Sequence, residues 1–186
     1  MQRENIVVPE CYVDTNLMNV LLNKSCNHQK GCATVCKTLN TKLADQFAIA
    51  IIDKDKKEPK AIEEYVQIGE SEHIIVSKHQ TRPHYLIQIK PAIEVFILDA
   101  AEELNVNLAD YGLPTELNEL RKITKTITAK EDVTFARLFH VLRSASHIQC
   151  LDNVLQYLLE NKYAASDAEI RKIMQSYTYS DAFLWV

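Results

Sequence analysis

Short runs of hydrophobic residues in the first half of the chain indicate β-strands. Residues 5–8 (NIVV) form a short buried strand that stops at Pro9, and residues 47–53 (FAIAIID) form an almost unbroken apolar run. A strand that is covered by helices on both faces has this pattern, so the second run is expected near the centre of a sheet. Three further short strands are predicted at residues 64–68, 73–79 and 84–90.

Apolar residues at helical spacing fill the chain between the first two strands. Residues 14–23 place leucines and a valine near the helical period, with Asp14 or Thr15 as a candidate N-cap. Residues 32–46 carry a second apolar stripe on one helical face. The order strand, helix, helix, strand implies a crossover between parallel strands. We therefore predict an α/β fold with a mostly parallel sheet flanked by helices.

The pattern changes at Pro91, after which helical periodicity continues towards the C-terminus. Pro91 stands at an expected first helical position, and the apolar residues that follow it keep a helical spacing. Further helical patterns occupy residues 113–127, 134–146, 148–163 and 166–177. The sequence therefore predicts an α/β domain at residues 1–90 and a C-terminal helical region at residues 91–186 that packs on it, and the two can form one compact domain.

Composition and charge narrow the functional classes. The 186 residues are 47% hydrophobic and 25% charged, as in folded globular proteins, and no apolar run approaches the ~20 residues that cross a bilayer. No membrane association is expected. The formal net charge of −4 provides no global attraction to nucleic acid. Because the N-terminus lacks a secretory signal and the five cysteines are an odd number, we expect free thiols and a cytoplasmic location.

Acidic residues follow two of the predicted parallel strands. Glu10 comes directly after the first strand, with Asp14 four positions later, and Asp53 and Asp55 stand at the end of the central strand. Parallel strands end at the same edge of a sheet, so we expect these carboxylates to meet there. Clusters of carboxylate oxygens suit Mg²⁺ or Mn²⁺. The sequence therefore predicts a metal site formed by Glu10, Asp14, Asp53 and Asp55.

The segments ECYVD and DKD carry a resemblance to a known family. Over roughly residues 5–90 the chain resembles the topoisomerase-primase (Toprim) domain, and especially the short relatives of OLD-family nucleases, which have Glu-Gly-x-x-Asp after the first strand and Asp-x-Asp after a later one. The resemblance implies that Glu10 acts as a general acid or base or as a metal ligand. It also implies that Asp53 and Asp55 bind the Mg²⁺ used in phosphodiester chemistry on DNA or RNA.

Other interpretations of the same residues stay open at this point. Cys11 stands where the family has glycine, and together with the few glycines and the acidic net charge it favours a non-catalytic interaction or regulatory protein that binds a protein partner. Asp14 is also explained as a helix N-cap, and the segment after Asp53 as a solvated loop of mixed charge. Glu94 either adds a carboxylate to the metal site or favours the start of a helix through the helix dipole.

The segment CNHQKGCATVC offers a separate metal hypothesis. It places Cys26, His28, Cys32 and Cys36 within a short stretch of chain. Their spacing differs from that of common structural zinc sites, and Cys32 and Cys36 also fit the apolar face of the second predicted helix. Core packing is the favoured interpretation of these cysteines.

Overall fold

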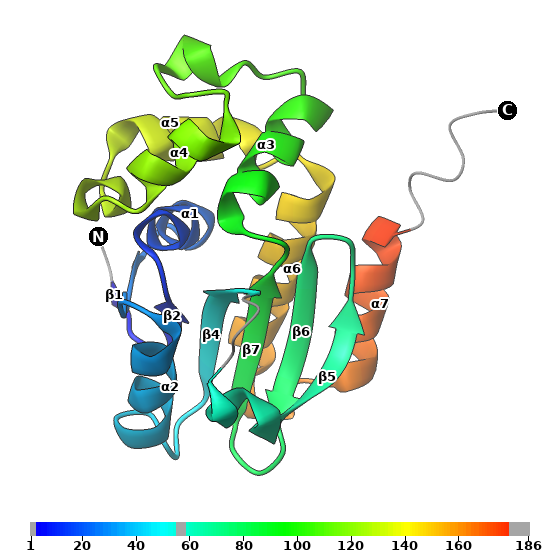
Figure 1. Cartoon of the computed structure of the whole chain (residues 1–186). Coiled ribbons are helices and arrows are strands. Elements are labelled where there is room, and N and C mark those ends of the chain that lie inside the picture. Colours follow the sequence, from blue (N-terminus) through cyan, green and yellow to red (C-terminus); the bar gives the residue numbers. More distant parts are fainter. Residues whose placement is uncertain (1–2, 55–58, 179–186) are drawn as a thin grey trace, which may run out of the picture.

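A five-stranded β-sheet forms the centre of the protein in the computed structural model, which describes residues 3–54 and 59–178 (Figure 1). Its strand order is β2-β4-β7-β6-β5. The strands are β2 (Val7–Pro9), β4 (Ala48–Asp53), β5 (Tyr65–Glu70), β6 (Ile74–His79) and β7 (His84–Ile89). A small second sheet pairs β1 (Arg3–Glu4) with β3 (Ser25–Cys26). All five predicted strands are present, which confirms the α/β class.

The sheet is mixed, which corrects the prediction of a mostly parallel one. Strands β2, β4 and β7 run parallel to one another, whereas β6 pairs antiparallel with both β7 and β5. The physical reason is the length of the connections. Only four residues, 80–83, separate β6 from β7, and a parallel pair would need a crossover of a dozen or more.

Helices surround the sheet within the described part of the chain. The α-helices are α1 (Tyr12–Leu22), α2 (Cys32–Thr41), α3 (Ile93–Glu103), α4 (Leu117–Thr124), α5 (Val133–Leu142), α6 (Ser146–Asn161) and α7 (Asp167–Thr178). Short 3-10 helices are η1 (Lys60–Glu64), η2 (Leu108–Tyr111), η3 (Ile127–Lys130) and η4 (Lys162–Ala164). In this part of the chain, no helix combines the length and apolar character needed to cross a membrane.

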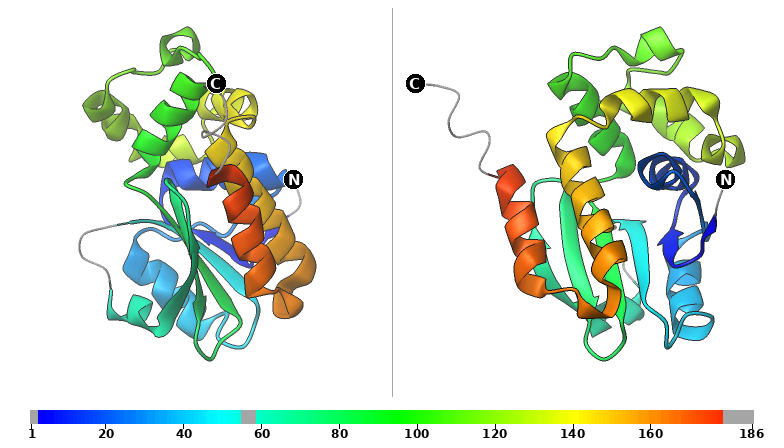
Figure 2. Two further views of the ribbon diagram at one scale, coloured as in Figure 1. Left: turned by 90° about the vertical axis from the view of Figure 1, so that its right-hand side faces the viewer. Right: turned by 180° about the vertical axis from the view of Figure 1, so that it is seen from behind.

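The two faces of the sheet have different cores. Side chains such as Ile51 and Ile87 lie in a large core with α1, α3, α5, α6 and α7. The neighbouring residues along β4, Ala50 and Ile52, point to the opposite face and pack in a smaller core with α2 and η1. The left-hand view of Figure 2 shows α6 and α7 along one face of the sheet and α2 on the other.

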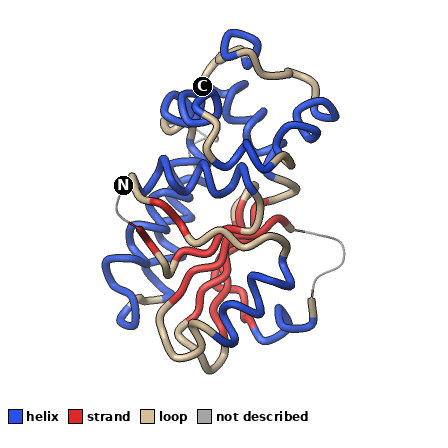
Figure 3. The backbone as a smooth tube through the Cα atoms, turned by 90° about the vertical axis from the view of Figure 1, so that its left-hand side faces the viewer, coloured by secondary structure: helices blue, strands red, loops and turns tan. Residues whose placement is uncertain are grey.

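The helical region from α3 to α5 lies beyond one edge of the sheet, above the strands in Figure 3. Strands β2, β4 and β7 all end at this edge, because they are parallel. Asn16 of α1 connects this region to the α/β part, since its side-chain amide donates hydrogen bonds of 2.9 Å to the carbonyl oxygens of Ala129 and Asp132. The carboxyl ends of the parallel strands are therefore enclosed by helices.

Candidate acidic site

Glu10 lies at the carboxyl end of β2, as predicted. Its backbone N–H donates to the carbonyl oxygen of Ile51 at 2.9 Å, so it continues the pairing with β4 for one more residue. Its Oε1 accepts a hydrogen bond of 2.8 Å from the backbone N–H of Cys32, the first residue of α2. A carboxylate at this position is favoured by the helix dipole. Glu10 therefore joins the end of a strand to the start of a helix.

Asp14 is fully buried in the first turn of α1. The expectation that Asp14 or Thr15 is the N-cap is wrong, because the helix begins at Tyr12 and Cys11 is its N-cap. The N–H of Asp14 donates to Cys11 Sγ at 3.3 Å, and Asp14 Oδ2 accepts from the N–H of Cys11 at 3.2 Å. This is a capping box in which cysteine and aspartate replace the usual residues. Asp14 Oδ1 has no hydrogen-bond partner within the described residues.

Asp53 is the last residue of β4, and its carboxylate connects this strand to α3. Asp53 Oδ1 accepts a hydrogen bond of 3.0 Å from the backbone N–H of Ile93, the first residue of α3. The expected first helical position, Pro91, lies outside the helix, whose N-cap is Ala92. Asp53 satisfies one of the N–H groups that a helix start leaves without an intrahelical partner.

Glu94 brings a fourth carboxylate to this edge of the sheet. It lies in the first turn of α3 and is 4% exposed. Its Oε1 accepts a hydrogen bond of 2.6 Å from Thr124 Oγ1, and Arg121 Nε lies 4.0 Å from its Oε2. The sequence signal was the position of Glu94 just after the last predicted strand. Thr124 and Arg121 had no such signal, because they lie about thirty residues further along the chain.

The four carboxyl groups, which we call the acidic cluster (Glu10, Asp14, Asp53 and Glu94), influence one another electrostatically. Burial, followed by the charges of Asp14, Glu94 and Glu10, raises the pKa of Asp53 to about 9. Burial, with smaller contributions from Glu10 and Glu94, raises the pKa of Asp14 to about 7. The neighbouring carboxyl groups therefore make Asp14 and Asp53 harder to ionise.

Cys11 is held in its thiol form by the same surroundings. Burial is the largest cause that raises the pKa of Cys11, and the charges of Asp14 and Asp53 add to it. A thiol whose pKa is raised is a weak nucleophile at neutral pH. Cys11 therefore serves the helix cap and does not provide a reactive thiolate.

No set of three or more His, Cys, Asp or Glu side chains within residues 3–54 and 59–178 converges in a way that could hold a metal ion. Asp55, the fourth predicted ligand, lies outside the described residues. The zinc hypothesis has no support in the geometry either, because Cys26 belongs to the large core while Cys32 and Cys36 pack against the smaller one. The acidic cluster is thus gathered at one edge without forming a closed coordination site.

Comparisons with known proteins do not assign the chain to a family: no family model, curated protein or solved structure matches it. The functional argument therefore depends on the acidic cluster and on its position at the carboxyl ends of parallel strands.

Proposed function

We propose that the protein is a Mg²⁺-dependent phosphoryl-transfer module of Toprim type, nuclease-like, that acts on nucleic acid. The observation that carries this proposal is the gathering of the acidic cluster at the carboxyl ends of β2, β4 and β7. Asp14 and Glu94 are buried there, Glu10 and Asp53 are half-buried, and the pKa values of Asp14 and Asp53 are raised. A bound cation would stabilise the ionised forms of carboxyl groups that repel one another, because the attraction of each carboxylate to the cation offsets the repulsion between them.

The chemistry of the side chains suits a hard divalent cation, although the described carboxylates do not converge on one point in this structure. All four side chains offer carboxylate oxygens, which Mg²⁺ and Mn²⁺ prefer. Asp14 Oδ1 is buried and has no hydrogen-bond partner among the described residues, so one acceptor oxygen is available without breaking a bond. Glu10, Asp14 and Asp53 would hold the metal, with Asp55 as the further ligand that the sequence motif suggests. When bound, the metal would polarise a phosphodiester group and lower the pKa of a bound water.

The protein's own residues would hold the carboxylates in place and set their protonation. Glu10 and Asp53 are each fixed by a backbone N–H at the start of a helix, which limits their motion. The raised pKa of Asp53 keeps a proton on this carboxyl at neutral pH. Glu94, held by Thr124, adds a further buried carboxyl group to the site.

The test combines metal binding with cleavage. We expect Mn²⁺ and Mg²⁺ to bind the full chain in calorimetric titrations, and labelled single- and double-stranded DNA and RNA to be cleaved in their presence. Asp53→Asn keeps an oxygen for the N–H of Ile93 but removes the charge, so we expect metal affinity to fall at least about tenfold and cleavage to be lost. The exposed Asp110→Asn is the matched control and should behave as wild type.

A non-catalytic interaction protein that keeps this fold is the second candidate. It is favoured by the lack of a converged metal group among the described residues and by Cys11 at the position where the Toprim motif has glycine. If the wild-type chain binds neither metal and cleaves none of the four substrates, this second function replaces the first.

A further inference from the structure

Two histidines from distant parts of the chain meet at the edge of the sheet beyond which α3 lies. His73 is in the turn between β5 and β6, and His147 is the second residue of α6 (Figure 1). Their ring centroids are 4.3 Å apart, and both rings pack edge-on against Phe96 of α3, at 6.0 and 4.5 Å. Their side chains are 14% and 8% exposed. We call these two residues the histidine pair; it lies where the turn, α3 and α6 meet.

The hydrogen bond of His147 fixes which of its ring nitrogens carries a proton. His147 Nε2 lies 2.9 Å from the carbonyl oxygen of Phe96, which can only accept, so Nε2 donates. In the neutral ring Nδ1 therefore has a lone pair, and it faces Glu103 Oε2 at 3.7 Å. The Glu103 carboxylate already accepts hydrogen bonds from the N–H and the hydroxyl of Ser146, at 2.8 and 2.9 Å. Two acceptors thus face each other until a proton is placed on Nδ1.

His73 has the same arrangement with a different carboxylate of α3. Its Nδ1 lies 3.8 Å from Asp99 Oδ2, and this nitrogen is buried without a hydrogen-bond partner among the described residues. A buried polar atom without a partner is unfavourable, whereas a proton on Nδ1 would turn the contact with Asp99 into an ion pair. Each ring of the histidine pair therefore has a carboxylate placed to stabilise its protonated form.

The short distance between the two rings opposes a second proton. Burial is the largest cause that lowers the pKa of His147, and the charge of His73 adds to it, whereas the carboxylates of Glu103 and Asp99 act in the opposite direction. Like charges at so short a separation each make the other harder to form. The histidine pair therefore takes up a first proton with the help of α3, while a second proton creates repulsion between the turn and α6.

The charged groups of the turn itself are engaged or exposed. Lys90, whose N–H donates to the carbonyl oxygen of His73 at 2.8 Å, forms an ion pair with Glu70. Glu72, which precedes His73 in the turn, is exposed to solvent. The carboxylates that lie against the histidine pair are therefore the two on α3.

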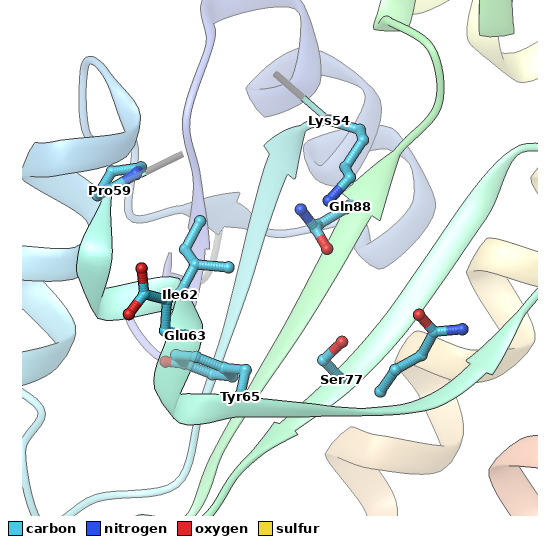
Figure 4. Close-up of a pocket in the computed structure, with 8 residues that line it drawn as sticks. Lys54, Pro59, Ile62, Glu63, Tyr65, Ser77 and Gln88 are labelled. Atoms are coloured by element: carbon cyan, nitrogen blue, oxygen red, sulfur yellow. The ribbon is translucent and has the colours of Figure 1, made fainter. Parts of the chain in front are cut away.

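His79, at the other end of β6, is a buried histidine in a different environment. Its Nε2 bonds the carboxylate of Glu64 at 2.9 Å, and its Nδ1 accepts hydrogen bonds from the N–H groups of Thr81 and Arg82 at 3.1 and 3.2 Å. Its ring packs edge-on against Tyr65, which lines a polar cavity on the face of the sheet that carries α2 (Figure 4). Both ring nitrogens of this histidine have partners, which distinguishes it from the histidine pair.

We propose that the histidine pair is a pH-sensitive switch, which holds the β5–β6 turn against α3 and α6 when it carries at most one proton and releases the turn when it carries two. Mildly acidic solution supplies the second proton, and the repulsion between the two rings then separates the turn from α6. Because α3 begins at the acidic cluster, where Asp53 bonds Ile93, the release would also reach that cluster. The switch does not depend on the proposed metal chemistry.

The test is amide hydrogen exchange of the full chain in EDTA at pH 7.5 and pH 5.5. After correction for the intrinsic pH dependence of exchange, we expect protection in the β5–β6 turn and in α3 to fall at least about tenfold at the lower pH. The central strand β4 serves as the internal reference and should keep its protection. Equal protection of the turn at both pH values would overturn the proposal.

Two variants remove the second charge and keep the packing. His73→Phe retains an aromatic ring against Phe96, and His147→Gln retains an N–H donor for the carbonyl oxygen of Phe96. In both variants we expect the difference in protection between the two pH values to shrink to within about twofold. His140→Gln removes an exposed histidine of α5, and this matched control should behave as wild type. The same large difference in all four proteins would show that another group opens the structure.

A proton NMR titration of the wild-type chain checks the coupling without any variant. We expect the imidazole rings of His73 and His147 to titrate in two separate steps, because the first charge opposes the second. In His147→Gln, the ring of His73 should titrate in a single step. If both rings of the wild-type chain titrate independently, with curves like that of the exposed His140, the rings are not coupled and the switch is lost.

Discussion

At the scale of single residues, the surroundings of the acidic cluster make ionisation of Asp14 and Asp53 unfavourable in the metal-free protein. Asp53 and Asp14 have raised pKa values because they are buried near other carboxyl groups. The unfolded chain ionises these residues near pH 4, whereas the folded chain keeps their protons to about pH 7 and about pH 9. The folded state therefore binds more protons across this window.

This difference in proton binding predicts how stability depends on pH. Where the native state binds more protons, the free energy of unfolding falls as pH rises. In EDTA, we expect the contribution of Asp14 and Asp53 to be fully present below about pH 4 and to be lost between about pH 4 and pH 9. Asp53→Asn should flatten this dependence and be more stable than wild type at pH 8 by roughly 1–3 kcal/mol.

Urea denaturation of both proteins at pH 5 and pH 8 measures the effect. The decisive quantity is the change in the wild-type minus variant difference between the two pH values, because it cancels the titration of other groups. A difference that stays constant would mean that Asp53 ionises freely in the folded protein.

The residue scale is also where sequence reasoning was least complete. Serine, threonine, aspartate and asparagine are the preferred N-caps, so the sequence pattern favours Asp14 or Thr15 over Cys11, the N-cap in the structure. Glu10 and Asp53 were placed correctly, because a residue at the end of an apolar run has little freedom in where it lies.

At the scale of elements, the apolar runs predicted the strands well, and the connections decided their direction. The run that became β4 is buried on both faces, as its unbroken hydrophobic pattern indicated. The four-residue connection at residues 80–83 is too short for a crossover between parallel strands, so it indicates that β6 and β7 are antiparallel. The packing of η3 and α5 on α1 could not be predicted, because its contacts, such as those of Asn16, join segments more than a hundred residues apart.

Asn16 therefore gives a prediction about element packing. Its side chain is 3% exposed and satisfies two carbonyl groups, so Asn16→Ala leaves buried acceptors without a donor. We expect a loss of about 1–3 kcal/mol in the free energy of unfolding, measured by urea denaturation. Asn118→Ala on the exposed side of α4 is the control, with an expected change within about 0.5 kcal/mol. Equal stability of the two variants would argue against this anchoring role.

At the scale of the whole molecule, one hydrophobic core connects both halves of the chain. The large core includes side chains from β2 near the N-terminus and from α7 near the end of the described residues. It therefore contains residues from both sides of residue 90, the position where the sequence pattern changes from mixed to helical. Domains that share one core usually unfold together.

This shared core predicts a single cooperative transition. We expect urea unfolding followed by far-UV and near-UV circular dichroism to give coincident curves, and calorimetry to give equal van't Hoff and calorimetric enthalpies. Two separated transitions, the first removing part of the helical signal, would show that residues 91–186 are an independent unit.

The contacts of Glu10 and Asp53 have a consequence for how a bound cation would act on the fold. Each carboxylate joins the end of a strand to the first N–H group of a helix, Glu10 to α2 and Asp53 to α3. A cation that draws either carboxylate towards itself weakens the contact of that carboxylate with the helix. Metal binding would then be coupled to the positions of α2 and α3, and any change that shifts these helices would alter metal affinity by the same factor.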